Sequence, residues 1–151
     1  MRIILNTLKA MLLSSIAQMT YAADELGEIC FSGSFKNTGE CFISIEVTQH
    51  IKYFSLNGLS QCDVIEGKEW LAQAYSGITH GNGYIDEESI FNGALDVFSP
   101  TNSDLIPKSL IFWVDLETQA VQFKATTDGT DFCSPFQNCE SLIDFDIIQC
   151  P

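Results

Sequence analysis

The chain has 151 residues, with 20 aspartates and glutamates against seven lysines and arginines, so its net charge is −13. A polyanion of this kind repels phosphate backbones and anionic lipid, and we therefore expect neither a nucleic acid nor a membrane as its partner. Hydrophobic residues make up 46% of the chain, which is enough to form the core of one domain.

Residues 1–22 have the pattern of a secretory signal peptide. Arg2 supplies a positive start, Ala10–Ala17 is apolar but too short to span a bilayer, and Thr20–Ala22 offers small residues at the cleavage positions. Cleavage after Ala22 would leave a single secreted domain over residues 23–151, with five lysines, no arginine and a net charge of −15. The expected location is extracellular, with the bacterial periplasm as the alternative.

All six cysteines lie within the expected mature domain, and an even number in an exported chain predicts disulfides. Cys30 and Cys41 are expected on opposite faces of one hairpin and out of register, so they cannot bond to each other. No Cys-x-x-Cys motif occurs, and no metal site is expected. The predicted pairs are Cys133–Cys139, which are close in sequence, then Cys30–Cys150 and Cys41–Cys62.

Alternating apolar residues predict a first β-hairpin over Ile29–Val47, turning at Asn37–Gly39. With Thr38 at the centre of the turn, one face is apolar or small throughout and the other is mostly polar. The predicted pairs on the buried face are Ile29–Val47, Phe31–Ile45, Gly33–Ile43 and Phe35–Cys41.

A second hairpin is predicted over Leu110–Ala125, with Leu116–Gln119 as its loop. Its buried face pairs Val114 with Val121, Phe112 with Phe123, and Leu110 with Ala125. The opposite face carries four candidate binding residues: Ile111, Trp113, Gln122 and Lys124. A solvent-facing tryptophan beside apolar and polar neighbours is typical of an interface anchor. The alternative is that a second sheet, the helix or a dimer partner covers this face.

The remaining segments are short and broken by glycine, proline and asparagine. Glu66–Tyr75 is either a short helix or a strand, Gly81–Gly83 is expected to be a turn, and Ala94–Phe98 and Leu142–Cys150 are expected to be strands. The sequence therefore predicts an all-β, mainly antiparallel fold. We expect a disulfide-stabilised β-sandwich or small barrel with at most one short helix.

The sequence offers little to an enzyme. Its only histidines, His50 and His80, are expected at the surface or in turns, and the mature chain has no arginine to stabilise a transferring phosphoryl group. The common nucleophile, zinc and phosphate motifs do not occur, so no catalytic residue and no cofactor are expected. A hydrolase that uses two carboxylates is the alternative.

The C-terminal third resembles the end of the Alternaria major-allergen family, which are secreted fungal β-barrels. The resemblance lies in Phe123–Thr126, in Phe132-Cys133 and in Cys139–Ile147, and it extends to the signal peptide, the mature size and Cys62 upstream of Trp70. It implies a fungal protein that acts on a plant or animal host by binding host defence proteins or small ligands.

We therefore expect a secreted, non-enzymatic protein of effector or allergen type that binds a host or extracellular protein partner, possibly a basic one. The alternative is an acidic inhibitor or binding module, periplasmic or secreted by a bacterium, that docks a basic enzyme.

Overall fold

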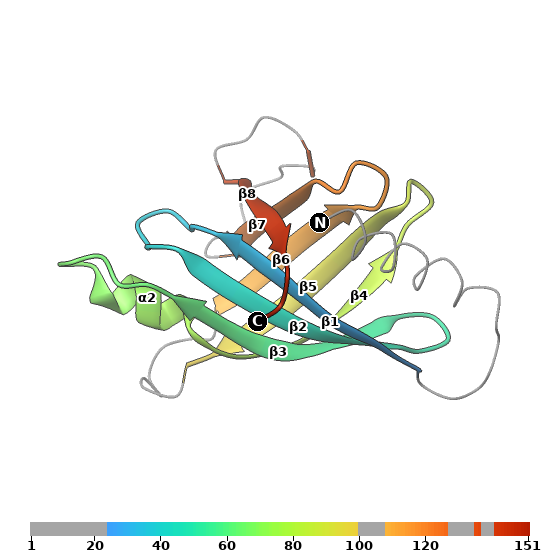
Figure 1. The fold of residues 1–151 in the computed structure, drawn as a ribbon, viewed down its shortest axis with the longest axis horizontal. Helices are drawn as coiled ribbons and strands as arrows, with labels where there is room; N and C mark the ends of the chain where they lie inside the picture. The colour runs from blue at the N-terminus through green and yellow to red at the C-terminus, as the bar shows by residue number, and fades with distance from the viewer. Residues whose placement is uncertain (1–23, 100–107, 127–134, 137–140) are drawn as a thin grey trace.

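The computed structural model describes residues 24–99, 108–126, 135–136 and 141–151. Eight antiparallel strands follow one another around a closed barrel, and the last strand pairs with the first (Figure 1). The strands are β1 (Asp24–Gly33), β2 (Cys41–Gln49), β3 (Phe54–Cys62), β4 (Gly77–Ile85), β5 (Ile90–Phe98), β6 (Lys108–Asp115), β7 (Val121–Thr126) and β8 (Ile143–Ile148), and the helix is α2 (Glu69–Tyr75). The predicted all-β fold is confirmed, and its form is the small barrel.

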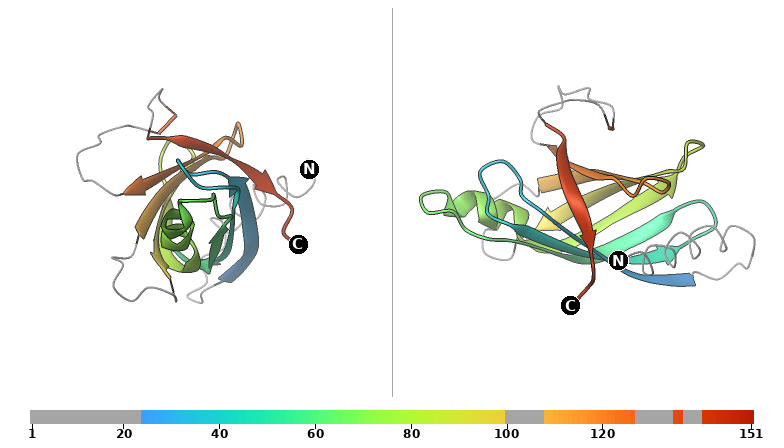
Figure 2. Two further views of the ribbon diagram at one scale, coloured as in Figure 1. Left: turned by 90° about the vertical axis from the view of Figure 1, so that its left-hand side faces the viewer. Right: turned by 45° about the horizontal axis from the view of Figure 1, so that its top comes forward.

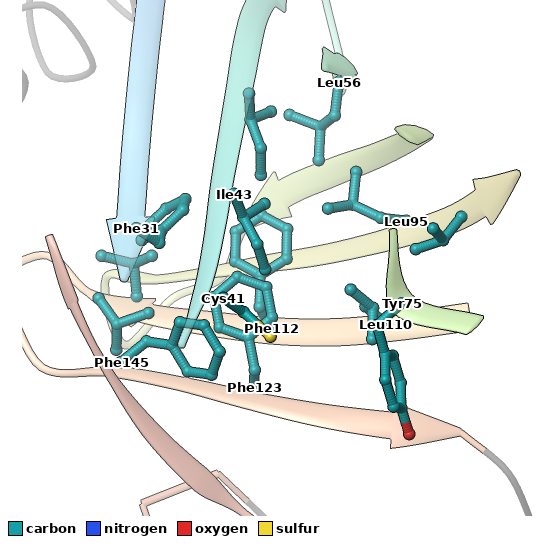
Figure 3. Packing of buried hydrophobic residues seen from close by; sticks show 14 of the residues in the cluster. Phe31, Cys41, Ile43, Leu56, Tyr75, Leu95, Leu110, Phe112, Phe123 and Phe145 are labelled. Carbon is teal, nitrogen blue, oxygen red and sulfur yellow. The ribbon is translucent and has the colours of Figure 1, made fainter. Parts of the chain in front are cut away.

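Aromatic rings fill the barrel. Phe31, Phe112 and Phe123 are buried and come from three different strands, and their ring centroids lie 5.0–5.8 Å apart (Figure 3). One interior cavity measures only about 20 Å³, and apolar side chains line it. That volume is close to the space of a single water molecule, so the interior at this point is a packed core rather than a ligand cavity.

Helix α2 closes one end of the barrel (Figure 2, left). Ala72, Ala74 and Tyr75 are buried, and the Tyr75 ring stacks on Phe35 with centroids 4.6 Å apart. Ser76 ties the helix end to β3, because its hydroxyl donates to the Ala72 carbonyl and accepts from the Cys62 N–H. The helix alternative for this segment is thus confirmed. No helix in the described part of the chain has the length and apolar character needed to cross a bilayer.

The described residues form two disulfides, and both are pairs expected from the sequence. Cys41 and Cys62 lie directly opposite each other on β2 and β3, with Cα atoms 4.0 Å apart. Cys30 on β1 bonds to Cys150, just beyond β8, with a Cα separation of 5.2 Å. Cys133 and Cys139 lie outside the described residues, as does the expected signal peptide over residues 1–22.

The first hairpin forms on the predicted segments, but its register is shifted by two residues. Phe31 pairs with Ile43 rather than Ile45. A shift of two keeps every side chain on its predicted face. The reason lies in the turn, where the Gly39 N–H donates to the Asp63 carbonyl at 3.0 Å. The start of β2 is thus anchored to the chain beyond β3, and the connection from β1 is longer than the predicted three-residue turn.

The second hairpin has the predicted register, whereas the middle of the chain differs from expectation. Gly81–Gly83 is part of β4 and not a turn. A Cβ on Gly81 would collide with the Ala94 carbonyl oxygen of the neighbouring strand, so glycine here permits close approach of two backbones. Strand β3 was not predicted, because its serines and asparagine resemble a loop.

Candidate functional site

The outer surface of β4, β5 and β6 carries a shallow groove. Tyr84, Asn92 and Trp113 lie side by side across these strands, since Asn92 pairs with both of the others. A second row beside them pairs Asn82 with Ala94 and Ala94 with Ile111. The small Ala94 leaves the hollow, and Lys52 stands at its rim. We define the outer groove by Tyr53, Asn82, Tyr84, Asn92, Ile111 and Trp113.

Two tyrosines present accessible rings along the groove. Tyr53 is 46% exposed and Tyr84 is 55% exposed. The Tyr53 ring is held in place by stacking on His50, with centroids 4.6 Å apart and planes 15° apart. His50 is itself fixed by a 3.0 Å hydrogen bond between its Nε2 and Ser55 Oγ. The Tyr53 ring is therefore ordered before any ligand arrives, which lowers the entropic cost of binding.

Asn82 and Asn92 have side-chain amide atoms that are available for further hydrogen bonds. Asn92 Nδ2 donates to Asp86 Oδ2 at 2.9 Å and to the Ile90 carbonyl at 3.0 Å, which fixes the amide plane. Its Oδ1 has no hydrogen-bond partner among the described residues. Asn82 is exposed, and within the same part of the chain its side-chain amide is also without a partner. A ligand in the groove can therefore be both a donor and an acceptor toward these two side chains.

Asp86 organises the turn between β4 and β5 and bonds to the groove residue Asn92. Its Oδ1 accepts from the backbone N–H groups of Glu88 and Ile90, at 3.0 and 2.9 Å. Burial acts to raise the pKa of Asp86, but the hydrogen bonds from Asn92, Ile90 and Glu88 together outweigh it and lower the pKa below its ordinary value of 3.8. The carboxylate is thus a fixed acceptor that orients Asn92.

Asp86→Ala is expected to lower the free energy of unfolding at neutral pH by about 0.5–2 kcal/mol, as for the loss of a side chain that caps backbone N–H groups. Because the folded-state pKa is depressed, this contribution is present above the ordinary pKa and disappears as the pH falls through the folded-state value. Denaturant unfolding of both proteins at neutral and acidic pH measures it. Glu87→Ala, at an exposed neighbour, is the control. An Asp86→Ala deficit that persists unchanged in acid would contradict the ionic role.

The four predicted binding residues share the outer side of β6 and β7, but only Ile111 and Trp113 line the groove. Trp113 and Lys124 are only 9% and 8% exposed, so a solvent-facing Trp113 is ruled out and the alternative of a covered face holds for these two residues. Phe136 lies against the same face, because its N–H donates to Gln122 Oε1 at 2.6 Å. Trp113 and Lys124 are therefore largely enclosed by the protein.

The Gln122 side chain makes contacts within the protein and is not available to a ligand. Besides accepting from Phe136, its amide donates through Nε2 to Asp144 Oδ1 at 2.9 Å. Both ends of the amide are thus occupied within the protein. Gln122 joins β7 to β8 on one side and holds Phe136 on the other.

Tyr53, Tyr84, Asn82 and Asn92 were not predicted as site residues. Tyr84 and Asn82 alternate with the inward glycines of β4, so the period-two pattern was present in the sequence. Reading Gly81–Gly83 as a turn hid that pattern. The stacking of Tyr53 on His50 depends on the geometry of the β2–β3 turn, for which the sequence gives no comparable signal.

Within the part of the chain that the structure describes, neither histidine is hydrogen-bonded to a carboxylate. His80 is exposed and its Nδ1 lies 2.6 Å from Asn57 Oδ1 on the neighbouring strand. Glu28 lies close to the sulfurs of Cys30 and Cys150, but these sulfurs are bonded to each other and are not thiolates. This cluster is therefore a poor metal site.

A second feature lies on the other side of the barrel, over β8, β1 and β2. Glu28 and Glu46 are exposed and directly opposite each other on neighbouring strands, and Asp144 and Asp146 are exposed on β8. We call these four residues the acidic face. Like charges directly opposite each other destabilise a sheet, so the Glu28–Glu46 pair has a cost that solubility alone does not require.

Comparison with known proteins gives no relative from which a function can be transferred. No protein-family model matches the chain, and neither does any curated protein or solved structure. The chemistry of the outer groove and of the acidic face is therefore the basis for a functional proposal.

Proposed function

We propose that this is a secreted, non-enzymatic binding protein of effector or allergen type, and that it receives an extracellular partner in the outer groove. The observation that carries the proposal is the pair of exposed tyrosines, Tyr53 and Tyr84, beside orientated asparagine amides. Aromatic anchors with adaptable polar neighbours are common at recognition surfaces. The strands hold Tyr84 and Asn92 on a rigid scaffold, as a preorganised site requires.

The residues that line the groove favour binding over catalysis. Among the described residues, the lining includes no histidine, carboxylate or cysteine, which are the usual general acids, bases and nucleophiles. The two disulfides support an oxidising compartment. Fungal origin and action on a plant or animal host belong to the same proposal and are supported by the resemblance of the C-terminal third to the Alternaria family.

The acidic face supports a second candidate function, that of a module docking a basic enzyme. Its four carboxylates add to a strongly negative net charge, which attracts a basic protein at long range. Attraction of this kind fades beyond about 8 Å at physiological ionic strength. It is therefore distinguishable from binding in the groove by its dependence on salt.

The test uses the mature, oxidised protein to capture a partner from candidate host extract, followed by affinity measurement with that partner. Tyr84→Ala is expected to weaken binding by about 1–4 kcal/mol, the range for an aromatic anchor. Phe98→Ala is the matched control, because Phe98 is an exposed aromatic residue, 49% accessible, outside the groove. The double variant Glu28→Gln with Glu46→Gln should leave affinity unchanged. If this double variant and high salt abolish binding while Tyr84→Ala does not, the second candidate is correct and the groove proposal fails.

A further inference from the structure

The outer groove differs in charge from the rest of this acidic protein. The chain has 20 carboxylates, yet none of those in the described residues lines the groove, where Lys52 is the charged residue among the described lining residues. Asp86 and Asp96 lie beside the groove, but the oxygens of Asp86 are directed to Asn92 and to backbone N–H groups, and Asp96 accepts from the Ser109 hydroxyl. A groove built for a basic peptide would place carboxylates where the ligand sits. The charge distribution therefore favours an uncharged ligand.

The groove also presents two kinds of contact that one class of neutral ligand needs together. Tyr53 and Tyr84 provide exposed ring faces against which apolar C–H surfaces can pack. Asn82 and Asn92 provide amide groups for hydroxyl groups, which both donate and accept. A pyranose ring combines the two properties, with C–H groups on its faces and hydroxyl groups at its edge.

The dimensions of the groove favour an oligomer over a single ring. Tyr53 directly precedes Phe54, the first residue of β3, which pairs with Gly83 of β4, so Tyr53 lies at the same level of the barrel as Tyr84. Asn92 and Trp113 continue that level on β5 and β6. Three strand spacings separate Tyr53 from Trp113, about 14 Å along the sheet. That distance exceeds the width of one sugar ring.

We propose that the ligand of the outer groove is a neutral oligosaccharide, bound by packing on Tyr53 and Tyr84 and by hydrogen bonds to Asn82 and Asn92. This inference rests on the proposed function and names the chemistry of the partner. The proposal is one of binding only, because no acid–base pair lines the described part of the groove.

The experiment measures calorimetric binding of the mature, oxidised protein to neutral oligomers of β-1,3-glucose, β-1,4-glucose and β-1,4-N-acetylglucosamine, with oligogalacturonate as the anionic probe. At least one neutral oligomer is expected to bind equally well in low and high salt. Tyr84→Ala and Tyr53→Ala should each weaken that binding about tenfold or more, whereas Phe98→Ala should retain it. Asn92→Ala tests the contribution of hydrogen bonds to the affinity, which it should lower. Thermal melting checks that this variant is folded.

Failure of this inference is distinct from failure of the proposed function. If no neutral oligomer binds, or if oligogalacturonate binds in preference, the oligosaccharide assignment is overturned. If a protein partner is lost on Tyr84→Ala and no oligosaccharide competes with it, the groove is a protein-binding site and only the ligand class is wrong. If Tyr84→Ala and Tyr53→Ala affect neither kind of binding, both proposals fall.

Discussion

Replacing Cys30 and Cys150 together with alanine is expected to lower the free energy of unfolding by about 5 kcal/mol, against about 3 kcal/mol for Cys41 with Cys62. The difference follows from loop length in the unfolded chain. The first bridge joins residues 120 apart in sequence, whereas the second joins residues 21 apart. A longer closed loop removes more conformational entropy from the unfolded state.

Loss of the Cys30–Cys150 bridge should also weaken one part of the barrel, strand β8, more than the rest. Strand β8 closes the barrel with short ladders on both sides. Within the described residues, it pairs with β1 from Cys30–Ile148 to Ser32–Asp146 and with β7 from Val121–Phe145 to Phe123–Ile143. The bridge anchors the chain just after this strand. Without it, we expect β8 to open before the rest of the barrel.

Denaturant unfolding of the two double variants gives the stability losses, and amide hydrogen exchange locates them. Exchange in β8 should quicken more in the Cys30→Ala, Cys150→Ala variant than in the Cys41→Ala, Cys62→Ala variant. Equal losses of stability, with exchange in β8 no faster than in β3, would contradict the view that this bridge secures the closure of the barrel.

The parts of the fold that were predictable are those governed by alternation along single strands. In β6 and β7, Phe112 and Phe123 face inward as buried partners, and a four-residue loop left one register compatible with the apolar pattern. In the first hairpin the same pattern fixed the face of Phe31 but not its partner, because registers that differ by two residues bury the same side chains. The turn contact from Gly39 to Asp63 decides between them, and it depends on a third strand.

The groove was less accessible from sequence because it consists of residues from four separate segments. Ile111 and Trp113 were identified from their face of one hairpin. The pairing of β4 with β5 and of β5 with β6 is what brings Tyr84 and Asn92 beside them. The burial of Trp113 was not predictable either, since an outward direction in a strand does not show which other segments lie over it. Exposure is a tertiary property, and alternation specifies only the side of the sheet.

Trp113→Ala is expected to destabilise the fold by about 3–5 kcal/mol, the cost of removing a large buried aromatic side chain. Although Trp113 points away from the barrel interior, it is only 9% exposed, so most of its surface packs against the protein. Phe98→Ala removes an aromatic side chain that is 49% exposed from the same side of the sheet, and it should cost about 0.5 kcal/mol or less. Thermal melting of both variants measures this contrast.

Trp113→Phe separates the structural part of Trp113 from any part in recognition. Phenylalanine keeps an aromatic ring at the base of the groove, so the fold should survive with a loss smaller than that of Trp113→Ala. Because little of the Trp113 surface reaches the groove, binding by the folded Trp113→Phe protein should fall less than binding by Tyr84→Ala. A Trp113→Ala protein that melts like the wild type yet loses its partner would contradict this prediction. Trp113 would then be an exposed anchor that contacts the partner directly.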